Sequence, residues 1–139
     1  MPEFVQRVAR VLFHIGCYCL SIGLASLGIL SALQPSAASE LYGIPASSDE
    51  AQQWVRVAGL RDLGLAISAF VLYISSPGSM RVFVPTLLPI PIGDAMITLA
   101  NGGREAFLGA CAHLLGTVAI AILAVCAWLG AEERRPKGS

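Results

Sequence analysis

Long apolar runs separated by short polar segments are the main pattern of this sequence. Four runs stand out, at residues 11–33, 57–74, 82–100 and 106–129. A helix needs about 20 mostly apolar residues to cross the hydrocarbon core of a bilayer, and each run is close to that length. The pattern therefore predicts an all-α fold, an integral membrane four-helix bundle that forms a single domain over residues 1–139.

The polar breaks between the runs carry turn-forming residues. Pro35 follows the first run, residues 75–79 (SSPGS) separate the second from the third, and residues 101–103 (NGG) separate the third from the fourth. Because the last two breaks are short, the helices that they join are expected to be antiparallel. After the last run, residues 132–139 mix charges with Pro and Gly and are predicted to be a disordered tail.

A secretory signal peptide is the alternative interpretation of the first run. Arg7 and Arg10 precede it, and the small residues Ala37 and Ala38 follow it. The apolar part of a signal peptide usually extends over about 7 to 15 residues, and this run is longer. We therefore interpret it as the first membrane span.

The composition supports membrane residence. Hydrophobic residues make up 55% of the chain and charged residues 13%, whereas about a quarter of an ordinary soluble domain is charged. Nine basic and nine acidic residues give a formal net charge of zero, so there is no basic field to attract nucleic acid. The lipid bilayer is the expected partner, and nucleic acid is not.

No metal, cofactor or disulfide framework is expected. His14 and His113 fall near opposite faces of the membrane in this arrangement of spans, so they cannot share one ion, and neither HExxH, CxxC nor a nucleotide-binding glycine loop occurs. All the cysteines lie inside apolar runs, where they are expected to serve as small packing residues: Cys17, Cys19, Cys111 and Cys126.

The distribution of basic residues predicts the orientation in the membrane. Arg56 and Arg104 flank one side, next to several acidic residues. The other side receives six basic residues, Arg7, Arg10, Arg81, Arg134, Arg135 and Lys137. Since cytoplasmic segments carry the excess of Lys and Arg, both termini are predicted to be cytoplasmic. In a fungal cell the endoplasmic reticulum is the expected membrane.

Four ionisable residues within the spans form the candidate site: Arg61, Asp62, Asp94 and His113. Such residues at membrane depth usually face the interior of a bundle or a wet cavity. Arg61, Asp94 and His113 lie six or seven residues from the non-cytoplasmic boundary, which places them about 9 to 11 Å deep. We therefore predict that three helices bring polar groups to one level. His14 falls near the cytoplasmic end of the first run and is interpreted as interfacial.

A structural interpretation of the same residues stays open. Arg61 would pair with Asp94 and hold the bundle together, with His113 as a hydrogen-bonding helper. The helices themselves could associate through small residues, namely Gly59, Gly64, Gly109 and Gly116.

Two further features allow two interpretations each. The prolines of the third run, Pro85, Pro89 and Pro91, either bend the helix and open space beside Asp94 or are simply tolerated in a membrane helix. The loop at residues 40–45 is either a lid on the membrane surface or a linker.

The order of four short segments resembles a known family: YGIP at 42–45, GLRDLG at 59–64, GD at 93–94 and AH at 112–113. Together they are similar to a family of small four-helix membrane proteins of unknown function, common in fungi and also found in bacteria. Fungal members often accompany secondary-metabolite pathways, and the chain also resembles membrane hydrolases that open polyketide epoxides. Carried over by position, the resemblance implies Arg61, Asp62, Asp94 and His113 as catalytic residues. The chain lacks a Ser, Cys or Lys nucleophile beside a base.

Two functions remain from the sequence. The first is a cofactor-free acid-base enzyme that hydrolyses or cyclises an epoxide in a lipophilic metabolite. In this hypothesis Asp94, neutral through burial, is the acid, and Asp62 beside Arg61 is the base. Limonene-type epoxide hydrolases resemble the chain in this chemistry rather than in fold. The second is a non-catalytic scaffold for pathway enzymes, or a small carrier that forms a homo-oligomer. An enclosed pocket around the cluster would favour the enzyme.

Overall fold

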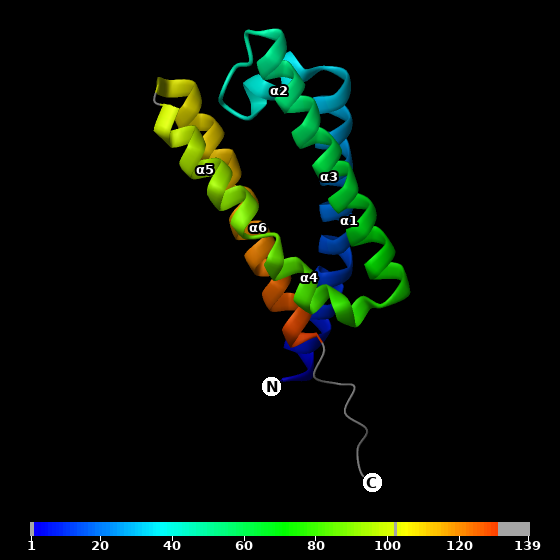
Figure 1. The fold of residues 1–139 in the computed structure, drawn as a ribbon. Coiled ribbons are helices and arrows are strands. Elements are labelled where there is room, and N and C mark those ends of the chain that lie inside the picture. The colour runs from blue at the N-terminus through cyan, green and yellow to red at the C-terminus, as the bar shows by residue number, and fades with distance from the viewer. Residues whose placement is uncertain (1, 102, 131–139) are drawn as a thin grey trace.

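The chain folds into helices connected by short turns (Figure 1). The structure is a computed structural model that describes residues 2–101 and 103–130. Residues 132–139, predicted from the sequence to be a disordered tail, lie outside these described residues. The elements are α1 (Glu3–Leu33), α2 (Pro35–Leu41), α3 (Asp49–Ser75), the 3-10 turn η1 (Pro77–Ser79), α4 (Met80–Thr86), α5 (Pro89–Asn101) and α6 (Gly103–Leu129).

The predicted all-α architecture is confirmed. Within the described residues, four stretches are long and apolar enough to cross a membrane: Glu3–Leu33, Asp49–Ser75, Pro77–Asn101 and Gly103–Leu129. The helices extend beyond the apolar runs into polar flanks. For example, α3 begins at Asp49 because the Ser48 side chain caps it, accepting a hydrogen bond from the Ala51 N–H at 3.2 Å. This polar first turn of α3 precedes its apolar part.

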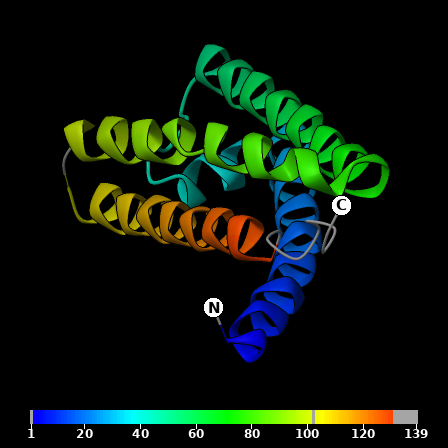
Figure 2. The same cartoon turned by 90° about the horizontal axis from the view of Figure 1, so that it is seen from below.

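The long helices form two pairs that diverge (Figures 1 and 2). The first pair, α1 and α3, packs along most of its length, and the second pair is α5 with α6. In the first pair the backbones meet at glycines, since a Cβ added at Gly59 would lie 2.8 Å from the Gly28 carbonyl oxygen. Small residues thus allow the close approach that is typical of membrane helices.

The two pairs meet directly where α1 begins and α6 ends, which we call the termini end. An apolar core gathers there from α1, α3, α4 and α6. It consists of Phe13, Cys17, Ala69, Met80, Val84, Leu123, Cys126 and Ala127. All four cysteines are free thiols, and Cys17 and Cys126 belong to this core. The opposite end, which carries α2 and the turn after it, is called the loop end.

The third span is broken between α4 and α5, as the prolines allowed. Leu87 N–H donates to the Val84 carbonyl at 3.1 Å, and Leu88 N–H donates to the Pro85 carbonyl at 3.2 Å. These three-residue spacings replace the four-residue spacing of an α-helix, because Pro89 has no N–H to continue the ladder and its ring disfavours helical backbone at the residue before it. The break lets α4 contact α6 at the termini end while α5 begins anew.

Candidate functional site

Arg61 and Asp62 form an ion pair on α3. Arg61 Nε donates to Asp62 Oδ1 at 3.1 Å, and Arg61 Nη2 lies 3.0 Å from the same oxygen. Asp62 is 5% exposed, whereas 45% of the Arg61 side chain is accessible. The partner of Arg61 is therefore its sequence neighbour, and the alternative in which Arg61 pairs with Asp94 is wrong on this point.

Tyr42, at the C-terminal end of α2, connects this ion pair to α1. Its hydroxyl donates to Asp62 Oδ2 at 3.4 Å and lies 2.9 Å from the hydroxyl oxygen of the fully buried Ser31. A tyrosine hydroxyl has one proton, and an ionised carboxylate can only accept. Hence Ser31 donates to Tyr42, and Tyr42 donates to Asp62.

The environment keeps the Tyr42 hydroxyl protonated. Burial raises the pKa of Tyr42 above its ordinary value of 10.0, and the hydrogen bond from Ser31 opposes this in part. At neutral pH the group is therefore a hydrogen-bond donor to Asp62.

Tyr42 also contacts the second helix pair. Its ring stacks on the His113 ring of α6, with the centroids 6.1 Å apart and an angle of 18° between the planes. The Thr98 hydroxyl of α5 lies 3.4 Å from the Tyr42 carbonyl oxygen and makes a shorter bond, 2.7 Å, to the Asp94 carbonyl oxygen. Through one residue, the loop end connects α1, α3, α5 and α6.

Two glycines make this position of Tyr42 possible. Gly43 has φ +81°, a left-handed backbone conformation that favours glycine. A Cβ added at Gly109 of α6 would lie 2.7 Å from the Gly43 Cα and equally close to the Tyr42 carbonyl oxygen. The segment is therefore packed against α6 at Tyr42 and Gly43.

Two polar groups of the cluster lack partners. His113 Nε2 is buried and has no hydrogen-bond partner among the residues that the structure describes. Asp94, half-buried on α5, uses its carbonyl for Thr98, and within residues 2–101 and 103–130 its carboxylate has no recorded hydrogen bond or ion pair. Since buried polar groups are normally satisfied, these are the positions at which a bound molecule would gain hydrogen bonds.

The predicted residues are thus brought together only in part. Arg61 and Asp62 are joined directly, and His113 joins them through the Tyr42 ring. Asp94 is connected through its backbone carbonyl and Thr98, and its carboxylate is near enough to Asp62 to act on it electrostatically. His14 is separate, as expected, because its Nδ1 lies 2.8 Å from the Tyr73 hydroxyl beside the termini-end core.

Ser31 and Tyr42 were missed by the sequence reasoning. Ser31 stands inside an apolar run, where a single hydroxyl carries little signal. Tyr42 was part of the segment that resembles the family, and the adjacent Gly43 was a sign of a constrained turn. Neither signal indicated which helices the tyrosine would contact.

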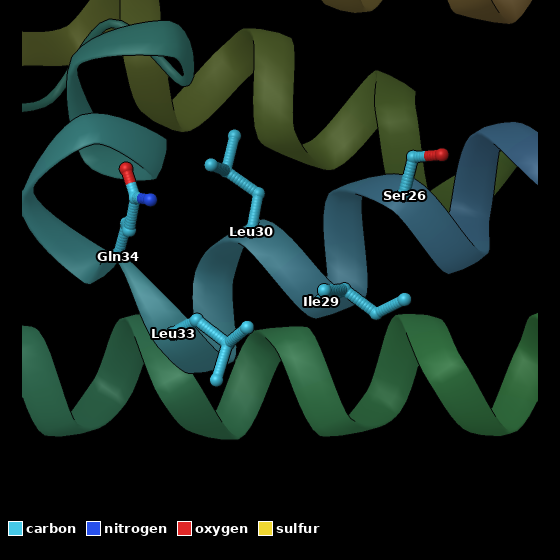
Figure 3. A pocket seen from close by; sticks show the side chains of 5 residues that line it. All are labelled: Ser26, Ile29, Leu30, Leu33 and Gln34. Carbon is cyan, nitrogen blue, oxygen red and sulfur yellow. The ribbon is translucent and has the colours of Figure 1, made fainter.

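The groove recorded in the structure lies apart from the cluster. It measures about 340 Å³ and is lined by Ser26, Ile29, Leu30, Leu33 and Gln34 along one side of α1. In Figure 3, Leu30 and Gln34 point away from α3. In the described part of the chain, no group of three or more His, Cys, Asp or Glu side chains is arranged to hold a metal.

Comparison with known proteins identifies one match. A family model described as "Domain of unknown function (DUF4267)" matches residues 21–129. No curated protein and no solved structure matches the chain. The matched region contains every residue of the cluster, from Ser31 to His113.

Proposed function

We propose that this chain, which belongs to the family described as "Domain of unknown function (DUF4267)", is a membrane-embedded acid-base enzyme that opens an epoxide in a lipophilic metabolite. One observation carries the proposal. Asp62, oriented by Arg61 and Tyr42, belongs to the same contact network as His113, whose Nε2 is buried without a partner. An oriented carboxylate that shares a contact network with an unsatisfied imidazole is typical of sites that move protons.

Opening an epoxide requires a base and an acid. The base removes a proton from water, or from a hydroxyl of the substrate in a cyclisation. The oxygen then forms a bond to one epoxide carbon as the carbon-oxygen bond breaks, and the acid gives a proton to the departing oxygen. Water gives a diol and an internal hydroxyl gives a ring, so neither product needs a cofactor.

The residues fit these roles as follows. Asp62 is the base, because Arg61 and Tyr42 together fix the direction of its carboxylate. Asp94 is the acid, since its carboxyl group has no protein partner to compete with the substrate oxygen. His113 returns the proton from base to acid between turnovers.

A lipophilic substrate suits the surroundings of the site. The candidate spans expose apolar faces along their length, so a substrate that partitions into the bilayer reaches the cluster without crossing water. We propose residence in the endoplasmic reticulum for a fungal chain, beside the other enzymes of a secondary-metabolite pathway.

A second candidate is a non-catalytic scaffold or carrier. The observation in its favour is that Tyr42 contacts all four candidate spans while the recorded groove contains none of the cluster residues. In that case the network is a clasp between helix pairs.

The test is expression of the full chain in a heterologous host that is supplied with candidate lipophilic epoxides. We expect the diol or cyclised product from the native chain. Asp94→Asn is expected to abolish it at wild-type protein levels, because the amide keeps the shape but cannot donate a carboxyl proton. Glu40→Gln, which alters an exposed acid on α2, is the control and should change neither product nor abundance.

Asp62→Asn tests the network that both candidates share. It leaves Arg61 without its counter-charge, so protein abundance should fall with activity in either case. Full turnover by Asp94→Asn would refute the enzymatic assignment. Absence of product from the native chain, together with lower abundance of Asp62→Asn, would instead support the clasp.

The orientation with both termini in the cytoplasm is tested by tags. A C-terminal tag should be cleaved by protease added outside sealed microsomes, whereas a site inserted next to Asp49 should be protected. The reverse pattern would invert the orientation.

A further inference from the structure

Arg61 has hydrogen-bond donors that its ion pair leaves unused. Its Nε and Nη2 both approach one oxygen, Asp62 Oδ1. A guanidinium carries five N–H donors, and within the described residues the others have no recorded partner. With 45% of its side chain accessible, Arg61 leaves these donors open to its surroundings.

The depth of Arg61 makes unused donors costly. It lies seven residues into its helix from Trp54, the exposed aromatic that marks the near membrane surface in the predicted orientation. At 1.5 Å per residue this is about 10 Å. A cation at that depth is stabilised by a polar partner, because lipid tails offer none.

The helix surface next to Arg61 is open. Gly64 follows Arg61 by three residues and Ser68 follows it by seven, so both share its side of α3, and both are exposed. A Cβ added at Gly64 would meet nothing within 4 Å. Ser68 uses its hydroxyl within the helix, donating to the Gly64 carbonyl at 2.8 Å. Because Gly64 has no side chain, the helix surface between Arg61 and Ser68 is open, and we call this open surface the Gly64 notch. It offers no free hydroxyl proton.

We propose that Arg61 and the Gly64 notch bind a lipophilic acid, a molecule with a carboxylate head and an apolar chain. The carboxylate accepts from the free guanidinium donors, which suit it in charge and in planar shape. The apolar chain runs from Gly64 past Ser68 towards the middle of the bilayer. Arg61 is nearer the membrane surface than Gly64, so this is the direction that an amphiphile already has in that leaflet.

Arg61 would then join two surroundings. One side of the guanidinium holds Asp62, which belongs to the Tyr42 network, and the other side receives the ligand. The inference that the substrate is a lipophilic acid rests on the proposed enzymatic function. The inference that Arg61 binds such an acid does not depend on turnover.

The experiment measures binding by native mass spectrometry of the full chain in detergent, titrated with oleate and, separately, with methyl oleate. Both probes have the same chain, and only oleate has a carboxylate. We expect oleate to bind at least tenfold more tightly, because a charge-assisted hydrogen bond is worth at least that factor. Equal binding of acid and ester would overturn the proposal.

Two variants locate the site. Arg61→Gln should remove the preference for oleate, and Gly64→Leu, which keeps the charge but fills the notch, should weaken oleate binding about tenfold. Gly23→Leu is the matched control, since a Cβ at Gly23 also meets nothing within 4 Å, and it should bind oleate normally. If Gly64→Leu binds as the native chain does, the notch is not the site. If Asp94→Asn still prefers oleate but has lost turnover, the binding site is intact although catalysis fails. If Asp94→Asn has lost the preference, oleate binding depends on Asp94, and the site proposed at Arg61 is overturned.

Discussion

The two ends of the bundle join the helix pairs by different means. At the termini end the pairs meet through apolar side chains such as Phe13, Met80 and Leu123. At the loop end they meet through Tyr42 and Gly43, which combine hydrogen bonds, ring stacking and a close backbone approach. Lipid tails compete with apolar contacts but not with hydrogen bonds. The loop end should therefore depend more on exact shape, and the termini end on packing volume.

The largest expected effect comes from adding a methyl group at the loop end. Gly109→Ala would place a Cβ 2.7 Å from the Gly43 Cα and the Tyr42 carbonyl oxygen. Both are backbone atoms that cannot turn aside, so α6 must separate from the loop. We expect a loss of about 2 to 3 kcal/mol in the free energy of unfolding, as is usual for overpacking. Thermal unfolding in detergent micelles measures it.

Gly116→Ala is the control on the same helix. A Cβ at Gly116 meets nothing within 4 Å, and alanine favours helix over glycine by about 1 kcal/mol. Its stability should be unchanged or slightly higher. Equal destabilisation by the two variants would mean that the loop is not seated on α6.

The next effect concerns packing volume at the termini end. Met80 is fully buried in the apolar core, and Met80→Ala leaves a cavity there. We expect a loss of about 2 kcal/mol, the low end for core truncations, because lipid rather than water surrounds the helices. Product formation by the remaining folded protein should be normal, as measured in the feeding experiment. A selective loss of activity would couple the two ends.

The four spans could be predicted because membrane crossing depends on the length of an apolar run, a local property. The boundaries were less accurate. The second run was placed at residues 57–74, but α3 begins at Asp49, since Ser48 and two acids stabilise a polar first turn that hydropathy does not detect. Of the four glycines predicted to pack, Gly59 and Gly109 make close approaches, whereas Gly64 and Gly116 meet nothing within 4 Å.

The site was harder to predict than the spans. Depth along a helix follows from counting residues, so Arg61 and His113 were correctly assigned to one region. Pairing depends on how far the helix pairs diverge, which residue spacing does not determine. The pair of Arg61 with Asp94 was therefore wrong, and the contacts of Tyr42, which follow from the turn at Gly43, were not foreseen.

A smaller effect is expected when the Tyr42 hydroxyl alone is removed. Tyr42→Phe keeps the ring on His113 but leaves Ser31 and Asp62 each short of one hydrogen bond. The loss should be about 1 kcal/mol, because the bond to Asp62 is long. Ser31→Ala tests the same network from α1. By double-mutant analysis the two losses should not add, and full additivity would mean that the hydroxyls do not interact.

The smallest effect concerns the stability of the loop end at high pH. Burial raises the pKa of Tyr42 above its ordinary value of 10.0, so above pH 10 the unfolded chain releases this proton while the folded chain retains it. The unfolded state then binds fewer protons than the folded state, and the free energy of unfolding falls as pH rises. Deprotonation of the folded chain would also place a phenolate next to the Asp62 carboxylate, and this repulsion lowers the free energy of unfolding further. We therefore expect the unfolding midpoint of the native chain to decline more steeply than that of Tyr42→Phe as the pH rises above 10. The other tyrosines are present in both proteins, so their titration cancels in the difference. Parallel declines would show that Tyr42 titrates alike in both states and that its hydroxyl is not held in the network.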